Sequence, residues 1–242
     1  MCGRYASPDK EAIVMRWPKI RCGCGGAWKP SANVAPTATV PLVVPTRDGG
    51  LELQAARWGL VPAWWTKTAP PALTFNARAE DAAHKPTWRD ALRTARGLMP
   101  ARGWYEWHRS RSTLDAAGRE VKQPYFLQCP GEPVIAFAAL WALWNRPDAD
   151  PLLSCALLTR PAAPNLAAIH PRMPMALKPE QFARWLDPAA SPDALQALLA
   201  DVRQDVQAQP VSTRVNDART DAPDLMDPIR PAPTSLFPAD ES

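Results

Sequence analysis

The sequence predicts an α+β domain built on a mixed or antiparallel β-sheet. Strand-like segments outnumber helical ones and rarely alternate with them, which disfavours a doubly wound parallel sheet. The chain of 242 residues contains 29 prolines, which break up long helices and favour short strands joined by rigid turns. With 46% apolar residues and no clear linker, the chain is expected to bury one sizeable core as a single domain.

The first half of the chain begins with a predicted short helix over residues 9–17. Residues 40–46 and 51–59 have the apolar content of strands and flank the turn Arg47-Asp48-Gly49-Gly50, which indicates a hairpin. A further short helix is predicted over residues 88–94, with the hydroxyl of Thr87 as its N-cap.

The second half is predicted to be rich in strands. Strand-like segments cover residues 97–107, 125–129, 134–143 and 152–159. Two helices and one late strand are predicted over residues 179–186, 192–206 and 211–215. Residues 115–121 are expected to form an exposed hairpin tip. The domain is predicted over residues 1–220, followed by a Pro-rich and partly mobile tail over residues 221–242.

Charge and cysteine content narrow the class of protein. The net charge of +4 and the isoelectric point near 8.9 permit a nucleic-acid partner without demanding one. The longest apolar stretch, residues 134–144, is shorter than the roughly 20 residues that a membrane span needs. Five cysteines without a secretory start favour a reduced, cytoplasmic protein. Cys22-Gly23-Cys24 lacks a second Cys or His pair, so neither a metal site nor a cofactor is expected.

Cys2 directly follows the initiator methionine, and this position gives it unusual chemical potential. Removal of Met1 would leave one residue with two nucleophiles, a free α-amine and a thiol. An α-amine has a pKa of about 7.7–8.0, so a useful fraction is neutral near pH 7. The pair suits an aldehyde, because the amine forms a Schiff base and the thiol then closes a thiazolidine ring. We expect the cation of Arg4 to favour the thiolate. The alternative is a cysteine on a frayed terminus.

Glu106 lies in the aromatic segment Gly103-Trp104-Tyr105-Glu106-Trp107. Alternation along a strand places Trp104 and Glu106 on one face and Tyr105 and Trp107 on the other. A carboxyl group flanked by indoles is desolvated, so its pKa is expected to rise toward the range useful for acid–base catalysis. The alternative is an edge-strand glutamate in water.

Asn76 and Arg78 lie within the segment Phe75-Asn76-Ala77-Arg78-Ala79-Glu80. The amide of Asn76 could hydrogen-bond a reacting centre, and the guanidinium of Arg78 could hold a phosphate. A capped turn with a surface arginine is the alternative.

Two prolines flank His170 and Arg172 and stiffen the segment His170-Pro171-Arg172-Met173-Pro174. A histidine with a fixed orientation suits proton transfer near pH 7, although a lone loop histidine is more often structural. The remaining histidines, His84 and His108, have polar neighbours and are expected at the surface.

Taken together, these segments resemble the SRAP family of abasic-site processing proteins. The resemblance covers essentially the whole chain, and its segments occur in family order. They are Met1-Cys2-Gly3-Arg4-Tyr5, Asn33-Val34-Ala35-Pro36, Trp58-Gly59-Leu60-Val61-Pro62 with Trp64-Trp65, Asn76-Ala77-Arg78-Ala79-Glu80, Gly103-Trp104-Tyr105-Glu106-Trp107 and His170-Pro171-Arg172-Met173-Pro174, with a weaker match at Val211-Ser212 and Val215-Asn216. The resemblance implies a barrel-like β-sheet core with short flanking helices. One departure is the Cys- and Gly-rich segment over residues 21–28, to which no function is assigned.

The resemblance also implies catalytic roles. Cys2 would crosslink, through a thiazolidine, to the ring-opened aldehyde of an abasic site in single-stranded DNA. Asn76 would hydrogen-bond the reacting sugar. Glu106 would serve as the acid–base group, for Schiff-base formation and for removal of Met1, and His170 would assist proton transfer. Abasic-site lyase activity is a further expectation.

The resemblance also implies a second set of residues, which would contact DNA. Arginines would hold flanking phosphates, one tryptophan would pack beside the lesion, and a proline with a tryptophan pair would block continuing duplex and favour ss/ds junctions. These residues are Arg4, Arg78, Arg172, Trp107, Pro36, Trp64 and Trp65. The implied protein is a nucleoid-associated monomer that acts at stalled forks in the DNA damage response, without a membrane partner.

Two other classes remain open at this point. An N-terminal-nucleophile amidohydrolase, such as a glutamine amidotransferase domain, also begins Met-Cys-Gly and uses its α-amine as a base. Paired tryptophans and scattered arginines are not features that a glutamine site calls for. A non-catalytic single-strand binding module, with an incidental Cys2, is the second alternative.

Overall fold

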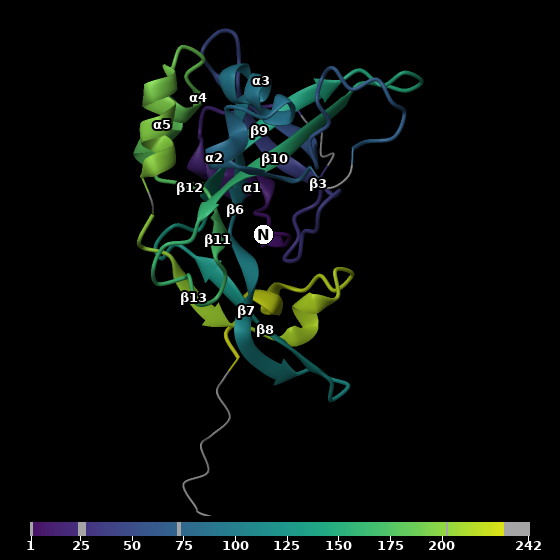
Figure 1. Ribbon diagram of the computed structural model, residues 1–242, viewed down its shortest axis with the longest axis vertical. Helices are drawn as coiled ribbons and strands as arrows, with labels where there is room; N and C mark the ends of the chain where they lie inside the picture. Colours follow the sequence, from purple (N-terminus) through teal and green to yellow (C-terminus); the bar gives the residue numbers. More distant parts are fainter. Residues whose placement is uncertain (1, 24–27, 72–73, 202, 230–242) are drawn as a thin grey trace, which may run out of the picture.

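Five strands close into a barrel that forms the body of the molecule (Figure 1). The computed structural model describes residues 2–23, 28–71, 74–201 and 203–229. The barrel strands are β3 (Thr39–Pro45), β4 (Leu51–Trp58), β6 (Arg96–Ala101), β9 (Ile135–Trp144) and β10 (Leu152–Pro161). They follow the order β10-β4-β3-β6-β9, and pairing of β9 with β10 closes the ring. Only the β4–β10 pair of this ring is parallel, so the predicted mixed, barrel-like sheet is confirmed.

Alternation along the strands divides the apolar residues between the inside and the outside of the barrel. Leu42 of β3 and Phe137 of β9 belong to the cluster that also contains Cys2. Their neighbours Val43 and Ala136 belong to a second cluster beneath the helices. Because successive side chains of a strand point to opposite faces, both faces of the barrel wall are apolar and buried.

A second, smaller sheet extends from the barrel, and two of its strands, β7 and β8, continue into a long hairpin. Its strands, in spatial order, are β1 (Tyr5–Ala6), β7 (Gly103–Leu114), β8 (Glu120–Gln128) and β13 (Gln207–Pro210). The prediction of one strand over residues 97–107 is wrong, because β6 ends at Ala101 and β7 begins at Gly103. A Cβ on Gly103 would lie 2.4 Å from the carbonyl oxygen of Leu127 on the neighbouring strand β8, so only glycine permits this close approach at the start of β7.

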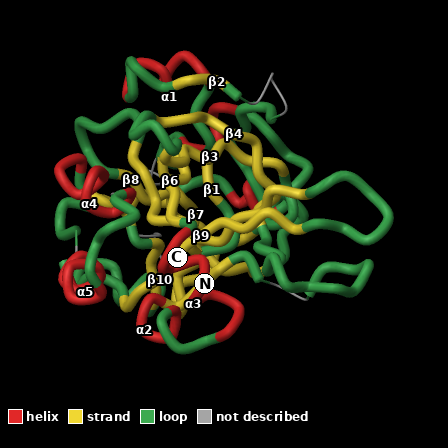
Figure 2. Tube along the Cα trace, turned by 90° about the horizontal axis from the view of Figure 1, so that it is seen from above, coloured by secondary structure: helices red, strands yellow, loops and turns green. Residues whose placement is uncertain are grey.

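Short strands edge the larger sheet, and short helices lie around it (Figure 2). The edge strands are β2 (Arg21–Cys22), β5 (Asn76–Arg78), β11 (Arg172–Pro174) and β12 (Ala176–Leu177). The α-helices are α1 (Lys10–Arg16), α2 (Ala79–Ala82), α3 (Pro86–Thr94), α4 (Phe182–Leu186) and α5 (Pro192–Ala200). Single 3₁₀ turns cover Pro179–Gln181, Thr213–Asn216 and Pro223–Met226. The predicted flanking helices are therefore confirmed, as is the hairpin turn near residue 115.

Two predicted helix boundaries are wrong. Helix α3 begins two residues earlier than expected: Lys85 occupies the N-cap position, Pro86 starts the helix, and Thr87 lies inside it. Helix α5 ends at Ala200 rather than at residue 206, and the carbonyls of Ala200 and Asp201 accept hydrogen bonds from Arg160. Because Arg160 is distant in sequence from α5, no local sequence pattern predicts this end of the helix.

The segment predicted as a late strand, residues 211–215, forms a single bridge at Val211 followed by a 3₁₀ turn. Beyond it, Leu225 is fully buried and Asp221 accepts a hydrogen bond from the backbone of Ala32. The predicted domain boundary at residue 220 thus lies inside a segment that packs against the body of the domain as far as residue 229. Residues 230–242 of the predicted tail lie outside the described residues. Within the described ranges, no helix is long and apolar enough to cross a membrane.

Candidate active site

Cys2 lies where the amino-terminal segment passes between the two sheets. Its side chain is fully buried, in the cluster that fills the barrel. The next residues are fixed on both sides, because Tyr5 pairs with Trp104 of β7 and exchanges backbone hydrogen bonds of 3.2 and 2.8 Å with Val34. The ring of Tyr5 also packs edge-on against Trp58, with 5.4 Å between ring centroids. The alternative of a frayed terminus is therefore wrong for Cys2.

Asn76 contacts Cys2 directly. It lies on β5, which pairs in parallel with β10 opposite Leu157. The side-chain Nδ2 donates a hydrogen bond of 2.7 Å to the carbonyl oxygen of Cys2. The amide Oδ1 is buried and has no hydrogen-bond partner among the described residues. A buried acceptor in that state is one that a bound ligand can satisfy.

Glu106 lies on β7, and the structure buries its carboxyl group almost completely. Only 3% of the residue is exposed, and burial raises the pKa of the carboxyl group to about 8. The predicted upward shift is therefore confirmed. Oε1 is buried without a hydrogen-bond partner in the described ranges, while Oε2 lies 3.8 Å from Nδ1 of His170.

The backbone of Arg172 fixes the imidazole of His170. Nδ1 lies 2.8 Å from the carbonyl oxygen and 3.1 Å from the amide nitrogen of Arg172. Partial burial lowers the pKa of His170, so the ring is neutral near pH 7. A neutral imidazole beside a carboxylic acid can move a proton without a change in net charge at the site.

The thiol of Cys2 is protonated in the resting structure, which contradicts the expected thiolate. Burial raises the pKa of the thiol well above its ordinary value, and the negative charge of Glu106 raises it further. The thiol points to the carbonyl oxygen of Arg4, with 3.8 Å between sulfur and oxygen. The guanidinium of Arg4 points elsewhere, to Asn33 Oδ1 at 2.8 Å and to the carbonyl of Val215 at 2.7 Å.

Asn33 was not predicted as a site residue, yet it ties the amino-terminal segment to the carboxy-terminal one. Its Nδ2 donates to the carbonyl oxygens of Asp217 at 3.0 Å and Thr220 at 2.8 Å, and only 3% of the residue is exposed. Its place in the segment Asn33-Val34-Ala35-Pro36 was the only signal available in the sequence. Trp107 completes this contact: Nε1 donates to Asn216 Oδ1 at 2.7 Å, and the guanidinium of Arg4 lies 5.8 Å from the Trp107 ring centroid.

The arginines predicted to contact DNA are not equivalent. Arg172 forms a bidentate pair with Glu80, at 2.6 and 3.0 Å, and donates to the backbone carbonyl of Thr159 at 2.7 Å. These hydrogen bonds lower the pKa of the Glu80 carboxyl group, so the pair is ionised near neutral pH. Arg78 is exposed at the end of β5. Of the predicted phosphate contacts, Arg78 is thus the most accessible.

The structure places the other predicted DNA contacts on two loops. Pro36 is half-buried, and the next residue, Thr37, has a φ of 77°, a strained value for a β-branched residue. Trp64 is 53% exposed, with its ring centroid 6.0 Å from that of Trp65. Trp65 Nε1 donates to the carbonyl of Ala69, which fixes the ring.

His108 is a further correction, because it is buried rather than on the surface. Only 7% of the residue is exposed. Its Nδ1 accepts hydrogen bonds from the backbone N–H groups of Ser110 and Arg111, at 3.3 and 3.1 Å. The irregular register of β7 between Trp107 and Ser112 turns the ring inward. His108 thus has a structural role within the hairpin.

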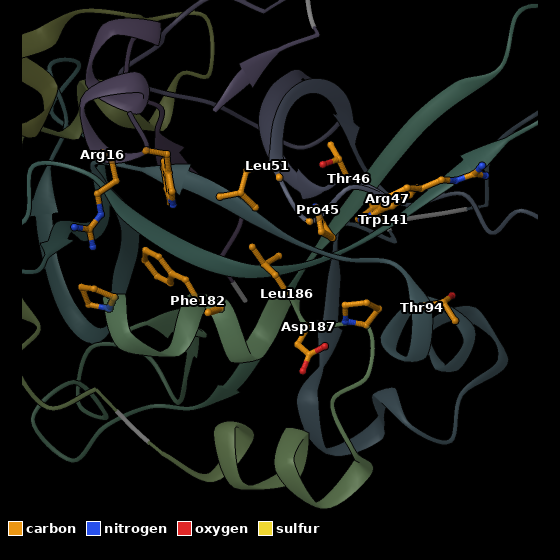
Figure 3. Close-up of a pocket in the computed structure, with 16 residues that line it drawn as sticks. Arg16, Pro45, Thr46, Arg47, Leu51, Thr94, Trp141, Phe182, Leu186 and Asp187 are labelled. Atoms are coloured by element: carbon orange, nitrogen blue, oxygen red, sulfur yellow. The ribbon is translucent and has the colours of Figure 1, made fainter. Parts of the chain in front are cut away.

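A cleft of about 840 Å³ lies elsewhere, between α4, the end of α1 and the β3–β4 turn (Figure 3). Trp141, Phe182 and Leu186 line it, and none of the predicted site residues does. Its volume would suit a small ligand. Of its lining residues, Arg16 alone has a buried side-chain atom without a hydrogen-bond partner among the described residues, so the Cys2 region is the stronger candidate for the active site.

The Cys2 region combines a thiol, a protonated carboxyl group, a neutral imidazole and an amide with an unsatisfied oxygen. Such a set supports covalent catalysis with proton transfer. Among the described residues, no cluster of at least three His, Cys, Asp or Glu side chains could hold a metal ion.

Comparison with known proteins gives one consistent result. The SOS response associated peptidase (SRAP) family matches residues 1–218. Abasic site processing protein YoqW of Bacillus subtilis is 33% identical over 231 residues, covering 94% of this chain and 99% of the relative. Abasic site processing protein YedK of Escherichia coli is 30% identical over 238 residues, covering 95% and 100%.

A crystal structure of a protein from Bacteroides thetaiotaomicron superposes with a TM-score of 0.78 at 22% identity, covering 95% of this chain and all of the other. That likeness supports the barrel and its attached sheet as a shared fold. The match over residues 1–218 and the 33% identity to YoqW over nearly all of both chains show that the chain belongs to the SOS response associated peptidase (SRAP) family.

Proposed function

We propose that this chain is an abasic site processing protein that forms a covalent thiazolidine with single-stranded DNA. The nucleophiles are the α-amine and the thiol of Cys2, and the target is the ring-opened aldehyde of an abasic site. The observation that carries the proposal is the burial of Cys2 beside Asn76 and Glu106, because Asn76 Oδ1 and Glu106 Oε1 lack hydrogen-bond partners in the described ranges. The printed names of the relatives, abasic site processing proteins, support the same substrate.

The chemistry balances with Glu106 as the proton carrier. The α-amine of Cys2 adds to the aldehyde carbon and gives a carbinolamine. Protonated Glu106, whose pKa is about 8, donates its proton to the carbinolamine hydroxyl, and water leaves to form an iminium ion. The resulting carboxylate then accepts the thiol proton as the sulfur attacks the iminium carbon. One water is lost overall, and Glu106 returns to its protonated form.

Two neighbours position the sugar for these steps. Asn76 holds the backbone of Cys2 through Nδ2, and its unsatisfied Oδ1 accepts a hydrogen bond from the opened sugar. Neutral His170 exchanges a proton with the freed sugar hydroxyl. Ring closure also protects the DNA, because a Schiff base activates the sugar for β-elimination and strand cleavage, whereas a thiazolidine does not.

The same residues account for exposure of the amine. Removal of Met1 is a hydrolysis: water adds to the carbonyl carbon of the Met1–Cys2 peptide bond, Met1 leaves as a free carboxylic acid, and protonated Glu106 can supply the proton that the departing α-amine of Cys2 needs. Autoproteolysis would then precede crosslinking. Exposed Arg78 and Trp64 fit a single strand at an ss/ds junction, by phosphate contact and base stacking.

One experiment tests the central claim. Purified protein is incubated with an oligonucleotide carrying one abasic site, and denaturing electrophoresis and intact mass are recorded. A stable adduct of protein plus DNA minus one water, on a chain that lacks Met1, is expected. Cys2→Ala should abolish the stable adduct while leaving an amine able to form a transient Schiff base. An equally stable Cys2→Ala adduct would rule out the thiazolidine.

A further inference from the structure

The β7–β8 hairpin carries cations that begin beside the candidate site, and the proposed function does not yet use them. Figure 1 shows the hairpin projecting from the body of the molecule. At about 3.3 Å per residue, strand β7 runs about 26 Å from Glu106 to Leu114. We call Arg109, Arg111 and Lys122, all exposed, the hairpin cations.

The arginines nearest the candidate site are already engaged in contacts within the protein, so further cations are needed to bind phosphates. Arg172 is neutralised by the bidentate pair with Glu80, and Arg4 is held by Asn33 and Val215. A phosphate must compete with those contacts for either guanidinium. Exposed Arg78 alone would leave a strand weakly held, since single-strand affinity grows with the number of phosphates neutralised.

Arg109 is the hairpin cation closest to the chemistry. Its backbone N–H donates to the carbonyl oxygen of Ile169 at 3.2 Å, which fastens β7 to the residue that precedes His170. Its positive charge contributes to the lowered pKa of His170, after the larger effect of burial. Its side chain is exposed and forms no salt bridge with any described residue. Arg109 is thus the first hairpin cation along β7 after Glu106.

The pattern of charge changes along the hairpin. Arg111 donates to the hydroxyl of Tyr125 at 3.4 Å, and Lys122 lies opposite Ser112, so neither faces an acidic partner in the ladder. At the tip, Arg119 is paired with Asp115 at 2.7 Å. Uncompensated positive charge therefore lies on the part of the hairpin next to the site.

We propose that the hairpin is a strand-binding arm in which Arg109, followed by Arg111 and Lys122, binds backbone phosphates of the single strand as it leaves the site. The proposal rests on the proposed function, because it assigns the path of the same substrate. Phosphate contacts position the strand without reading its sequence. The arm thus adds affinity that is sensitive to salt and independent of bases.

Binding is measured with the full chain and a fluorescent single-stranded oligonucleotide that carries a tetrahydrofuran abasic analogue, which has no aldehyde and cannot crosslink. Anisotropy titrations at several salt concentrations give the slope of log K against log salt. Arg109→Ala should reduce the slope by about 0.7, the value for one phosphate of a single strand. Arg109→Lys should retain it. Arg119→Ala is the matched control, because Asp115 already neutralises that cation, and its slope should stay at the wild-type value.

The outcomes separate this inference from the proposed chemistry. The proposed strand-binding arm would be contradicted if Arg109→Ala left the salt slope unchanged, or if Arg119→Ala reduced the slope as much as Arg109→Ala does. Competition by polyglutamate at the same concentration of charge as the oligonucleotide would overturn it in favour of an acidic protein partner. Wild-type protein that binds the analogue but forms no adduct with a true abasic site would refute the thiazolidine and leave the arm standing. Thermal unfolding of each variant confirms that the exposed substitutions leave the fold intact.

Discussion

Two buried polar regions of the molecule differ in one respect, the satisfaction of their hydrogen bonds. Arg96, 3% exposed at the start of β6, donates to the carbonyl oxygens of Leu92, Arg93 and Trp185, and also to that of Asp187. It thereby caps the carboxy-terminal ends of α3 and α4. Arg96 is as little exposed as Glu106, but each of its three guanidinium nitrogens donates at least one hydrogen bond.

The Cys2 region has the opposite character. Asn76 Oδ1 and Glu106 Oε1 are buried without partners in the described ranges, and the pKa of Glu106 rises to about 8. An unsatisfied buried group lowers stability, so its retention points to function rather than to architecture. The comparison teaches that burial of charge alone does not mark a site. Among the described residues, Asn76 Oδ1 and Glu106 Oε1 are the amide and carboxyl oxygens that are buried without a hydrogen-bond partner, and both lie in the Cys2 region.

The largest expected effect comes from Glu106→Gln. The amide has the same shape but cannot donate and accept a proton in turn, so the rate of adduct formation should fall by about 10²–10⁴-fold. The fold should persist, because the substitution removes an ionisable group from a dry site. Single-turnover crosslinking measures the rate, and circular dichroism checks the fold. A rate within threefold of wild type would place the proton carrier elsewhere.

Arg96→Ala should lower the stability of the fold and leave the crosslinking rate unchanged. It leaves the carbonyls at the ends of α3 and α4 without their donor, at a cost of about 3–5 kcal/mol in the free energy of unfolding. The crosslinking rate of the protein that remains folded should equal the wild-type rate. Urea denaturation measures the stability, with Arg96→Lys as a partial rescue. A loss of rate at unchanged stability would erase the contrast between the two regions.

The barrel could be predicted from the sequence because its signal is local. Apolar alternation and turn residues identified β3, β4, β9 and β10 within a few residues. The break between β6 and β7 could not be predicted, since it depends on how close Leu127 comes to Gly103 across the sheet. The early end of α5 and the 3₁₀ turn after Val211 likewise depend on partners far away in sequence.

The candidate site, like the fold, could be predicted only in part from the sequence. The aromatic neighbours of Glu106 in the sequence predicted that its carboxyl group is desolvated, and the structure confirms the raised pKa. The state of the Cys2 thiol was mispredicted, because proximity of Arg4 in sequence said nothing about where its guanidinium points. Neither the pairing of Arg172 with Glu80 nor the contacts of Asn33 could be seen before tertiary structure, as their partners are distant in sequence.

The unusual pKa of Glu106 should appear in the pH dependence of stability. Its pKa is about 8 in the folded state and about 4.3 in the unfolded chain, so the folded state holds a proton that the unfolded state has lost between these values. The contribution of Glu106 is therefore complete below pH 4 and declines as pH rises toward 8, by at most about 1.4 kcal/mol per pH unit. The difference in unfolding free energy between wild type and Glu106→Gln isolates this effect. A difference independent of pH would mean that the folded carboxyl group titrates normally.

The smallest effect is expected from Asn33→Ala, which probes a saturated group at the border of the site. Losing the donors to Asp217 and Thr220 and the acceptor for Arg4 should cost about 1–3 kcal/mol. Hydrogen exchange should accelerate over residues 215–220, and the crosslinking rate should fall only a few-fold, because Arg4 loses its support but Glu106 does not. Asn165→Ala is the matched control: this exposed amide donates to one carbonyl, that of Val206, and its loss should change stability by less than about 0.5 kcal/mol. If Asn33→Ala instead lowered the rate as much as Glu106→Gln does, then saturated polar groups would carry the chemistry as well, and open hydrogen-bond valence would no longer distinguish the two regions.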